Sequence, residues 1–369
     1  MAKRATKNPP SLLGQIFKTV TDKLRGPLAI IMGLPSEVIP FVNDLPRMPV
    51  TCYEMDLYPA ARLRHELSAI GLDADVTCAA DLWDLPANFQ TVVCPAPKGG
   101  ARELKIDMVE QAYHILKPKG TLIVATPFQL DQFFPHLLKK IFGKIHSPET
   151  DNSTSIFWCQ RDGERPRRRH EVTFQIRGEA GQPSLRFLSR PGVFTYGRMD
   201  DGARALLEAA VLHPDENVLD LGCGCGTNGV LAAQRTGLEA AITFVDSNLR
   251  ALALAEHNAR SNGLTNFKTV ATATMEGLAA KSFDVVLANP PYFAHSVIAR
   301  QFIEKSRGFL KPGGCFYLVT KQPKELAPMI VEAFGHTDAL MARAYTILAA
   351  RVAGASEARK LFRLETEAL

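Results

Sequence analysis

The stretch Val218-Leu-Asp-Leu-Gly-Cys-Gly-Cys-Gly226 decides the fold of this chain, because it joins a short apolar strand to a glycine-rich turn. Gly222, Gly224 and Gly226 have no side chains, so the backbone can turn tightly there and approach a ligand closely before a helix begins. Such a turn suits a nucleotide-like cofactor. Taken alone, it equally suits NAD, FAD or a plain strand-to-helix connection.

Two later segments narrow the choice, because each follows a predicted strand. Residues 241–245 form an apolar strand that ends in Asp246, whose carboxylate can bind both ribose hydroxyls of a nucleoside. The run 284–288 ends in Asn289-Pro-Pro-Tyr292, which offers an amide, free carbonyls and an aromatic face to a planar substrate with an amino group. Strands and helices alternate from Pro214 onward, which predicts a doubly wound, mostly parallel α/β sheet. The carboxyl ends of its strands would then collect all three segments in one cleft.

The order of these motifs points to a known family. Asp220-Leu-Gly-Cys-Gly-Cys-Gly226, Asp246, Asn289-Pro-Pro-Tyr292 and Leu310-Lys-Pro-Gly-Gly314 together resemble class I methyltransferases that use S-adenosylmethionine. The lead-in segment Pro191-Gly-Val-Phe-Thr-Tyr-Gly-Arg-Met-Asp-Asp-Gly202 resembles the bacterial ribosomal RNA guanine-N2 methyltransferases, which are two-domain enzymes of the small and large subunits. The resemblance implies methyl transfer from S-adenosylmethionine to the exocyclic amine of a guanine in ribosomal RNA.

The catalytic residues expected from this reading are Asn289, Pro290, Pro291 and Tyr292. The side-chain oxygen of Asn289 and the backbone carbonyl of Pro290 would accept the two hydrogens of the amine and turn its lone pair toward the methyl group. Tyr292 would stack on the base, an interaction worth about 1 to 3 kcal/mol. The alternative is a strand-ending turn, since Asn and Pro both favour turns.

A second set of residues is expected to hold the cofactor. Asp246 would bind the ribose, whereas Asp220 would either orient the turn or accept a hydrogen bond from the methionine ammonium, and both roles stay open. The family often has Asp or Asn against the adenine where this chain has Thr274, so weaker cofactor binding is a hypothesis. The full expected set is Phe194, Asp200, Gly202, Asp220, Gly222, Gly224, Gly226, Asp246, Thr274 and Asn289.

An internal repeat explains the first half of the 369 residues. The segment Thr51-Cys-Tyr-Glu-Met-Asp56 and the helical pattern after it echo the strand before Asp246 and its helix, at an offset near 190 residues. We therefore predict two tandem Rossmann-like domains, residues 1–165 and 170–369, with a charged boundary in between. The first copy is degenerate because its turn, Met32-Gly-Leu-Pro-Ser36, has one glycine and a proline. It should bind no cofactor and position RNA or the catalytic domain.

The charge and cysteine content of the chain bear on its partners and its location. The net charge of +5 is modest, but basic residues crowd two places, namely Lys3, Arg4 and Lys7, and Arg161, Arg165, Arg167, Arg168 and Arg169. The second run suits either a solvated linker, which we slightly favour, or contact with RNA phosphates. The seven cysteines show no zinc spacing or disulfide framework, and no stretch has the length to cross a bilayer. We expect a soluble, cytoplasmic protein without a metal.

Other functions remain open at this stage. Tyr292 stands where the ribosomal enzymes usually carry phenylalanine, and tyrosine there is common in enzymes that methylate adenine-N6 or the side-chain amide of glutamine. A protein glutamine methyltransferase acting on a translation factor is thus an alternative, but it leaves the degenerate first copy unexplained. A non-enzymatic RNA-binding protein is a third. The expected partner is ribosomal RNA or an assembling subunit, and the subunit, the nucleotide and the oligomeric state stay undetermined.

Overall fold

The computed structural model describes residues 11–150, 154–178, 181–290 and 297–354. The chain divides into two compact units, Met1–His170 and Glu171–Leu369, and each is described by itself. Lys3, Arg4 and Lys7 of the first basic cluster lie outside the described residues.

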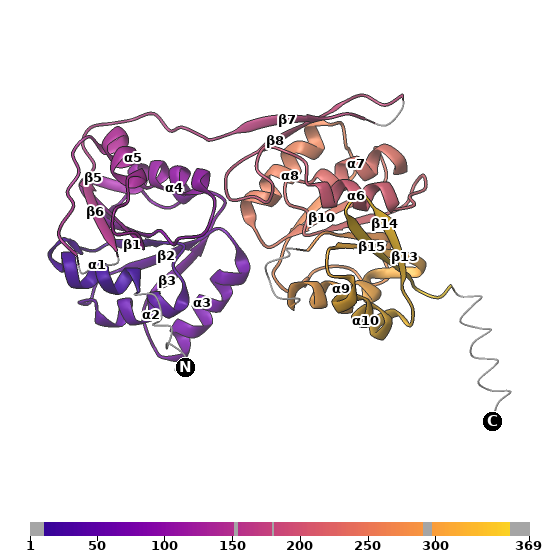
Figure 1. The fold of residues 1–369 in the computed structure, drawn as a ribbon, viewed down its shortest axis with the longest axis horizontal. Helices are drawn as coiled ribbons and strands as arrows, with labels where there is room; N and C mark the ends of the chain where they lie inside the picture. Colours follow the sequence, from indigo (N-terminus) through magenta and orange to yellow (C-terminus); the bar gives the residue numbers. More distant parts are fainter. Residues whose placement is uncertain (1–10, 151–153, 179–180, 291–296, 355–369) are drawn as a thin grey trace, which may run out of the picture. The chain divides into compact units, whose positions relative to one another are not determined.

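The N-terminal unit is built on a six-stranded sheet with the order β3-β2-β1-β4-β5-β6 (Figure 1). The first five strands are parallel, and β6 pairs with β5 in the antiparallel direction. All four residues of β1 are buried. The strands are β1 (Leu28–Ile31), β2 (Val50–Glu54), β3 (Asp75–Cys78), β4 (Phe89–Pro95), β5 (Leu116–Thr126) and β6 (Ser155–Gln160).

Helices cover both faces of this sheet, as a doubly wound fold requires. One face packs against α1 (Leu12–Val20), α2 (Pro35–Asp44) and α3 (Leu57–Ala69), and the short helix η1 (Thr21–Lys23) follows α1. The other face packs against α4 (Arg102–Ile115), α5 (Phe133–Phe142) and the short helix η2 (Leu82–Asp84). Figure 1 shows α4 and α5 together on one side of the sheet and α1 to α3 on the other.

The C-terminal unit begins with a hairpin, in which β7 (Val172–Ile176) pairs with β8 (Leu185–Ser189) in the antiparallel direction. A seven-stranded sheet follows, with the order β11-β10-β9-β12-β13-β15-β14. Its first five strands in this order are parallel, and β15 and β14 are antiparallel. The strands are β9 (Val218–Leu221), β10 (Ile242–Asp246), β11 (Phe267–Ala271), β12 (Phe283–Ala288), β13 (Leu310–Thr320), β14 (Asp338–Ala342) and β15 (Tyr345–Arg351).

The helices of this unit are arranged as in the first. One face of the sheet carries α6 (Asp201–Ala209), α7 (Thr227–Thr236) and α8 (Leu249–Ser261), whereas the other carries α9 (Val297–Phe309) and α10 (Pro323–Phe334). Among the described residues, no helix has both the length and the apolar character needed to cross a bilayer.

The two units share one strand order, so the predicted internal repeat is confirmed: β3-β2-β1-β4-β5-β6 matches β11-β10-β9-β12-β13-β15. The register corrects one detail. Ile31 pairs with Tyr53 as Leu221 pairs with Val245, so the counterpart of Asp246 is Glu54 rather than Asp56. Asp56 instead caps α3, as Asn248 caps α8. The sequence comparison failed here because an acidic residue stands at both positions.

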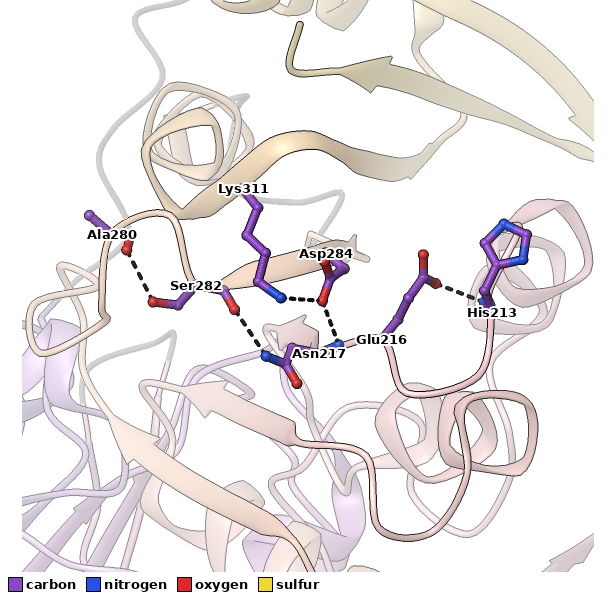
Figure 2. A network of polar contacts seen from close by, with 7 residues as sticks. All are labelled: His213, Glu216, Asn217, Ala280, Ser282, Asp284 and Lys311. Atoms are coloured by element: carbon purple, nitrogen blue, oxygen red, sulfur yellow. Dashed lines mark hydrogen bonds and ion pairs between the residues drawn. The ribbon is translucent and has the colours of Figure 1, made fainter. Parts of the chain in front are cut away.

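A polar network ties together the amino ends of three strands of the C-terminal sheet (Figure 2). The Asp284 carboxylate accepts from the Lys311 ammonium at 2.6 Å and from the Asn217 backbone N–H at 2.9 Å. The Asn217 amide nitrogen donates to the Ser282 carbonyl at 3.3 Å. These residues precede or begin β9, β12 and β13, so the network fixes the end of the sheet opposite the glycine turn.

Candidate active site

The carboxyl ends of β10, β9 and β12, three neighbouring strands, bring the predicted motifs to one edge of the sheet. β9 runs into the glycine turn, β10 ends in Asp246, and Asn289 follows β12. The parallel pairing carries Leu221 next to both Val245 and Ala288, so the three strands end at the same level. This convergence is what the motif order predicted.

The three positions of the turn require glycine for different local reasons. All three have positive φ, which a residue with a side chain rarely adopts. A Cβ on Gly226 would lie 3.0 Å from the Ala255 Cα in α8, and one on Gly222 would lie 3.2 Å from the Phe302 ring. A Cβ on Gly224 would meet no atom within 4 Å. Gly222 and Gly226 therefore permit close packing, while Gly224 presents bare backbone to open space.

Asp246 is held against this turn by backbone donors. One carboxylate oxygen accepts from the Gly224 N–H at 2.9 Å, and the other accepts from the Asn248 N–H at 2.9 Å. Each carboxylate oxygen has two lone pairs and can accept more than one hydrogen bond. The turn and the acidic residue therefore form one preorganised unit.

Asp220 lies beneath the turn, where its side chain has no solvent exposure. Its carboxylate accepts from the Gly229 N–H at 2.8 Å, in the first turn of α7. The helix begins after Gly226, which has no side chain to cap it, so Asp220 supplies the missing acceptor. Burial raises the pKa of this carboxyl to about 7. Its contact is with the helix, which is the geometry of a residue that orients the turn.

The lead-in segment is fastened beside the glycine turn. The Arg250 guanidinium donates to the Pro191 carbonyl at 2.6 Å, and the Asn248 amide donates to the Gly192 carbonyl at 3.0 Å. Val193 packs in a small buried cluster that includes Cys225. Phe194, the next residue, is 47% exposed, so its ring is outside that cluster and open to a ligand.

The structure places Asp200 in contact with Asn289. The Asn289 amide nitrogen donates to the Asp200 carboxylate at 3.0 Å, and the same carboxylate oxygen accepts from the Ala203 N–H at 3.0 Å as the N-cap of α6. Gly202 is buried in the first turn of that helix. The lead-in segment thus reaches the end of β12, across the strand that carries the glycine turn.

Four other predicted residues have no contact with the motifs above that the structure describes. Pro290 is buried directly after Asn289, whereas Pro291 and Tyr292 lie outside the described residues. Thr274 is exposed beyond the end of β11, and its N–H is donated to the Thr272 hydroxyl at 3.2 Å.

Sequence reasoning missed the side chains that brace the site. Asn258 is fully buried and joins β8 to the turn, because its amide donates to the Cys225 carbonyl at 2.8 Å and accepts from the Leu188 N–H at 2.7 Å. Arg250 is also fully buried. The N-cap role of Asn248 was readable from an Asn ahead of a helical pattern, but these long-range partners carry no local signal.

Comparison with known proteins agrees with this geometry. The Methyltransferase small domain family matches residues 184–349. The ribosomal RNA small subunit methyltransferase C of Shewanella pealeana is 30% identical over 78% of this chain and 89% of its own. The ribosomal RNA large subunit methyltransferase G of Streptomyces avermitilis is 27% identical over 69% of each chain.

Among solved structures, the T. thermophilus 16S rRNA N2 methyltransferase RsmC, in complex with AdoMet and guanosine, has the same two-unit fold. It superposes with a TM-score of 0.74 at 22% identity and covers 95% of this chain and 93% of its own.

A doubly wound sheet with an open glycine turn, an acidic strand end and an amide at the third strand defines the Rossmann-like class I methyltransferases, which use S-adenosylmethionine. Within that class, the chain belongs to the family of ribosomal RNA small subunit methyltransferase C. The resemblance inferred from the motifs is thereby confirmed.

The residues present fit S-adenosylmethionine. Gly224 offers unobstructed backbone, the Asp246 carboxylate is held next to it by the Gly224 N–H, and the exposed Phe194 ring follows a segment that α8 holds beside the turn.

Proposed function

We propose that this protein transfers a methyl group from S-adenosylmethionine to the exocyclic N2 amine of a guanine in ribosomal RNA. One observation carries the proposal, namely the hydrogen bond from the Asn289 amide nitrogen to Asp200 at the edge that also holds the glycine turn. Membership of the family and the names of the relatives support ribosomal RNA as the substrate.

The pairing with Asp200 determines what Asn289 can do. An ionised carboxylate only accepts hydrogen bonds, so the atom next to it must be the amide nitrogen. The amide oxygen is then the acceptor that Asn289 offers to a substrate amine. The Pro290 carbonyl accepts the second amine hydrogen, and Tyr292 stacks on the base. These contacts aim the nitrogen lone pair along one direction, which is the main contribution an enzyme can make to such a transfer.

S-adenosylmethionine supplies an activated methyl group on a sulfonium, so the protein needs no strong base before the attack. Asp246 would hold the ribose hydroxyls, and the Gly222 to Gly226 backbone would lie against the nucleoside. Thr274 would take the adenine side, while Phe194, Asp200 and Gly202 would close the methionine end. Asp220 contributes by holding the turn against α7.

The N-terminal unit is proposed to bind no cofactor. A Cβ on Gly33, the single glycine of its turn, would lie 2.5 Å from the Val38 side chain, so this turn is already packed against its own helix. Glu54, at the position of Asp246, is 4% exposed, and burial raises the pKa of its carboxyl to about 8. A mostly protonated, buried acid is a poor ribose acceptor at neutral pH.

The substrate is proposed to be an unpaired or flipped-out guanine, because a paired guanine hides its amine inside the helix. Naked ribosomal RNA and an assembling subunit both satisfy this requirement. The reaction is placed in the cytoplasm, where ribosomal RNA is found. Adenine N6 and glutamine N5 remain the competing methyl acceptors, because Tyr292 suits these two as well as guanine N2.

The deciding experiment measures transfer of radiolabelled methyl from S-adenosylmethionine to each ribosomal subunit, its RNA and bulk protein, followed by nucleoside analysis. We expect N2-methylguanosine from one subunit, and its loss in Asn289→Ala. Ser282→Ala, which removes only a hydroxyl that donates to the Ala280 carbonyl at 3.0 Å at the opposite end of the sheet, is the matched control and should keep full activity. Label in protein would replace the proposal by glutamine methylation, and N6-methyladenosine would replace it by adenine methylation.

A further inference from the structure

A groove of about 470 Å³ lies within the N-terminal unit, and no residue of the degenerate turn lines it. Its two walls are α4 and α5, which lie together on one side of the sheet in Figure 1, and residues from the arginine-rich boundary complete it. Arg102, Ile106 and Glu110 are spaced four residues apart on α4, and Phe133, Leu137 and the neighbouring His136 and Lys140 follow one face of α5. Such spacing aligns side chains along one stripe of a helix.

Residues 162–169 of the arginine-rich boundary are exposed, as expected of a solvated stretch, and contacts also fasten this boundary to the N-terminal unit. Arg165 donates to the Ile141 carbonyl at 2.8 Å, at the end of α5, and Tyr113 donates its hydroxyl to the Gly163 carbonyl at 3.0 Å. Arg167 lies over the Trp83 ring at 5.5 Å, and His170 pairs with Glu110 at 3.2 Å. The stretch is therefore a strap that holds its exposed arginines next to the groove.

The groove combines an apolar floor with a cationic rim. Leu137 is buried and Phe133 half-buried, whereas Arg102, Lys140 and Arg168 are exposed. The Arg102 guanidinium lies 5.0 Å from the centre of the Phe133 ring, which forms a flat, positively charged platform. Arg102, Lys140 and Arg168 thus line the groove together with one carboxylate, Glu110, which lies 3.2 Å from the His170 imidazole.

The charges of the strap's arginines act on two titratable side chains beside it. Burial, followed by the charges of Arg167, Arg161 and Arg165, lowers the pKa of the His114 imidazole below its usual value. Partial burial raises the pKa of Glu110, but the hydrogen bond from His170 and the charges of Arg168 and Arg165 outweigh it, so this pKa is lowered.

We propose that the α4–α5 groove binds one unpaired nucleotide of the RNA substrate, with its base against the Phe133–Arg102 platform and its phosphates against Lys140 and Arg168. The volume lies within the range of pockets that bury a small ligand. An aromatic face flanked by cations is the usual way to hold single-stranded RNA without sequence preference. The proposal rests on the proposed function, since it takes ribosomal RNA as the substrate.

The test measures binding of the full-length protein to a fluorescent unpaired RNA oligonucleotide at several salt concentrations. Lys140→Ala and Arg168→Ala should each lower the slope of log affinity against log salt by about 0.7, because each removes one phosphate contact. Phe133→Ala should raise Kd about 5- to 150-fold, the loss expected for one stacked base. On ribosomal RNA the loss should fall on KM rather than on kcat.

Two variants serve as controls. Lys139→Ala removes an exposed cation of α5 outside the groove and should leave the salt slope unchanged. Arg102→Lys keeps the charge and removes the flat guanidinium, so it should weaken binding while keeping the slope. Unfolding temperatures within about 2 °C of the wild type would show that each variant folds.

Unchanged affinity and slope in Lys140→Ala, Arg168→Ala and Phe133→Ala together would overturn the groove proposal. Groove-dependent capture of an acidic protein in place of RNA would overturn it in favour of a protein partner. Failure of the proposed function is distinguishable, because it would appear as absent N2-methylguanosine in the wild type, whatever the binding experiment shows.

Discussion

The two units share one sheet topology, yet the acidic side chains at the ends of β10 and β2 differ in the hydrogen bonds that they accept. Asp246 accepts two backbone hydrogen bonds, including one from Gly224 at 2.9 Å. Among the described residues, no hydrogen bond reaches the Glu54 side chain, and burial raises the pKa of this carboxyl to about 8.

The lengths of the two turns explain this difference. Met32 and Gly222 occupy equivalent positions in the two units, since the N–H of each donates to the backbone carbonyl of the residue before the acidic strand end. The helix that follows is capped by Leu34 in the first unit and by Gly226 in the second, so the second turn is longer by two residues. The longer turn contains Gly224, whose N–H reaches Asp246. Two additional residues in the turn therefore distinguish the acidic strand end that a backbone N–H holds from the one that none holds, while the strand order around them stays the same.

The largest expected effect is on the chemistry of the C-terminal unit. Asn289→Ala removes the oriented amide and should lower kcat by about 100- to 1000-fold, the loss usual for one preorganised polar group. Binding of S-adenosylmethionine, measured by calorimetry, should change far less than kcat. A kcat within threefold of the wild type would show that the amide does not orient the amine.

The next effect concerns the stability of the N-terminal unit. The pKa of Glu54 in the folded protein, about 8, exceeds its ordinary value of 4.5. The contribution of this protonated carboxyl to the free energy of unfolding is therefore complete below pH 4.5 and is lost as pH rises through about 8. Glu54→Gln should remove this loss and be more stable than the wild type by roughly 2 to 4 kcal/mol at pH 9. Urea unfolding at pH 5 and pH 9 measures it.

Glu66→Gln is the control for this experiment, because Glu66 forms an exposed pair with Arg62 and should change stability by less than about 1 kcal/mol. Equal pH dependence in Glu54→Gln and the wild type would contradict the assigned pKa.

A smaller effect separates the two acidic strand ends. Asp246→Ala should weaken S-adenosylmethionine binding about 10- to 30-fold, since it removes a charged acceptor and the brace on Gly224. Glu54→Ala should leave the affinity unchanged. Calorimetric titration should give one site per chain, and a second site lost in Glu54→Ala would show that the N-terminal copy still binds the cofactor.

The smallest effect tests the pairing of Asp200 with Asn289. Asp200→Ser keeps an N-cap for α6 but removes the carboxylate, so kcat should fall about tenfold while stability changes by less than about 1 kcal/mol. Single-turnover kinetics at saturating S-adenosylmethionine measures the chemical step. A change confined to cofactor affinity would assign Asp200 to the methionine end of the pocket alone.

The sequence carried enough local information to predict most of the architecture. Apolar runs ending in glycine, acid or amide mark the strands β9, β10 and β12, and their order in the chain implies a shared edge because parallel strands end together. The duplication was readable because residues 51–56 and the helical pattern after them echo the strand before Asp246 and its helix. The equivalence of Glu54 with Asp246 needed the register, because Asp56 resembled Asp246 more closely in type.

By itself, the sequence determined the doubly wound fold, its duplication and the motifs of the methyltransferase edge, since these depend on periodicity and on residues close together in the chain. Only the tertiary structure decided that Asn289 meets Asp200, 89 residues away, and that Asp220 caps a helix. It also decided that the arginine-rich strap borders a groove between α4 and α5. The physical reason is that hydrogen bonds and burial depend on distances in space, and no local pattern records which distant strand or helix will supply the partner.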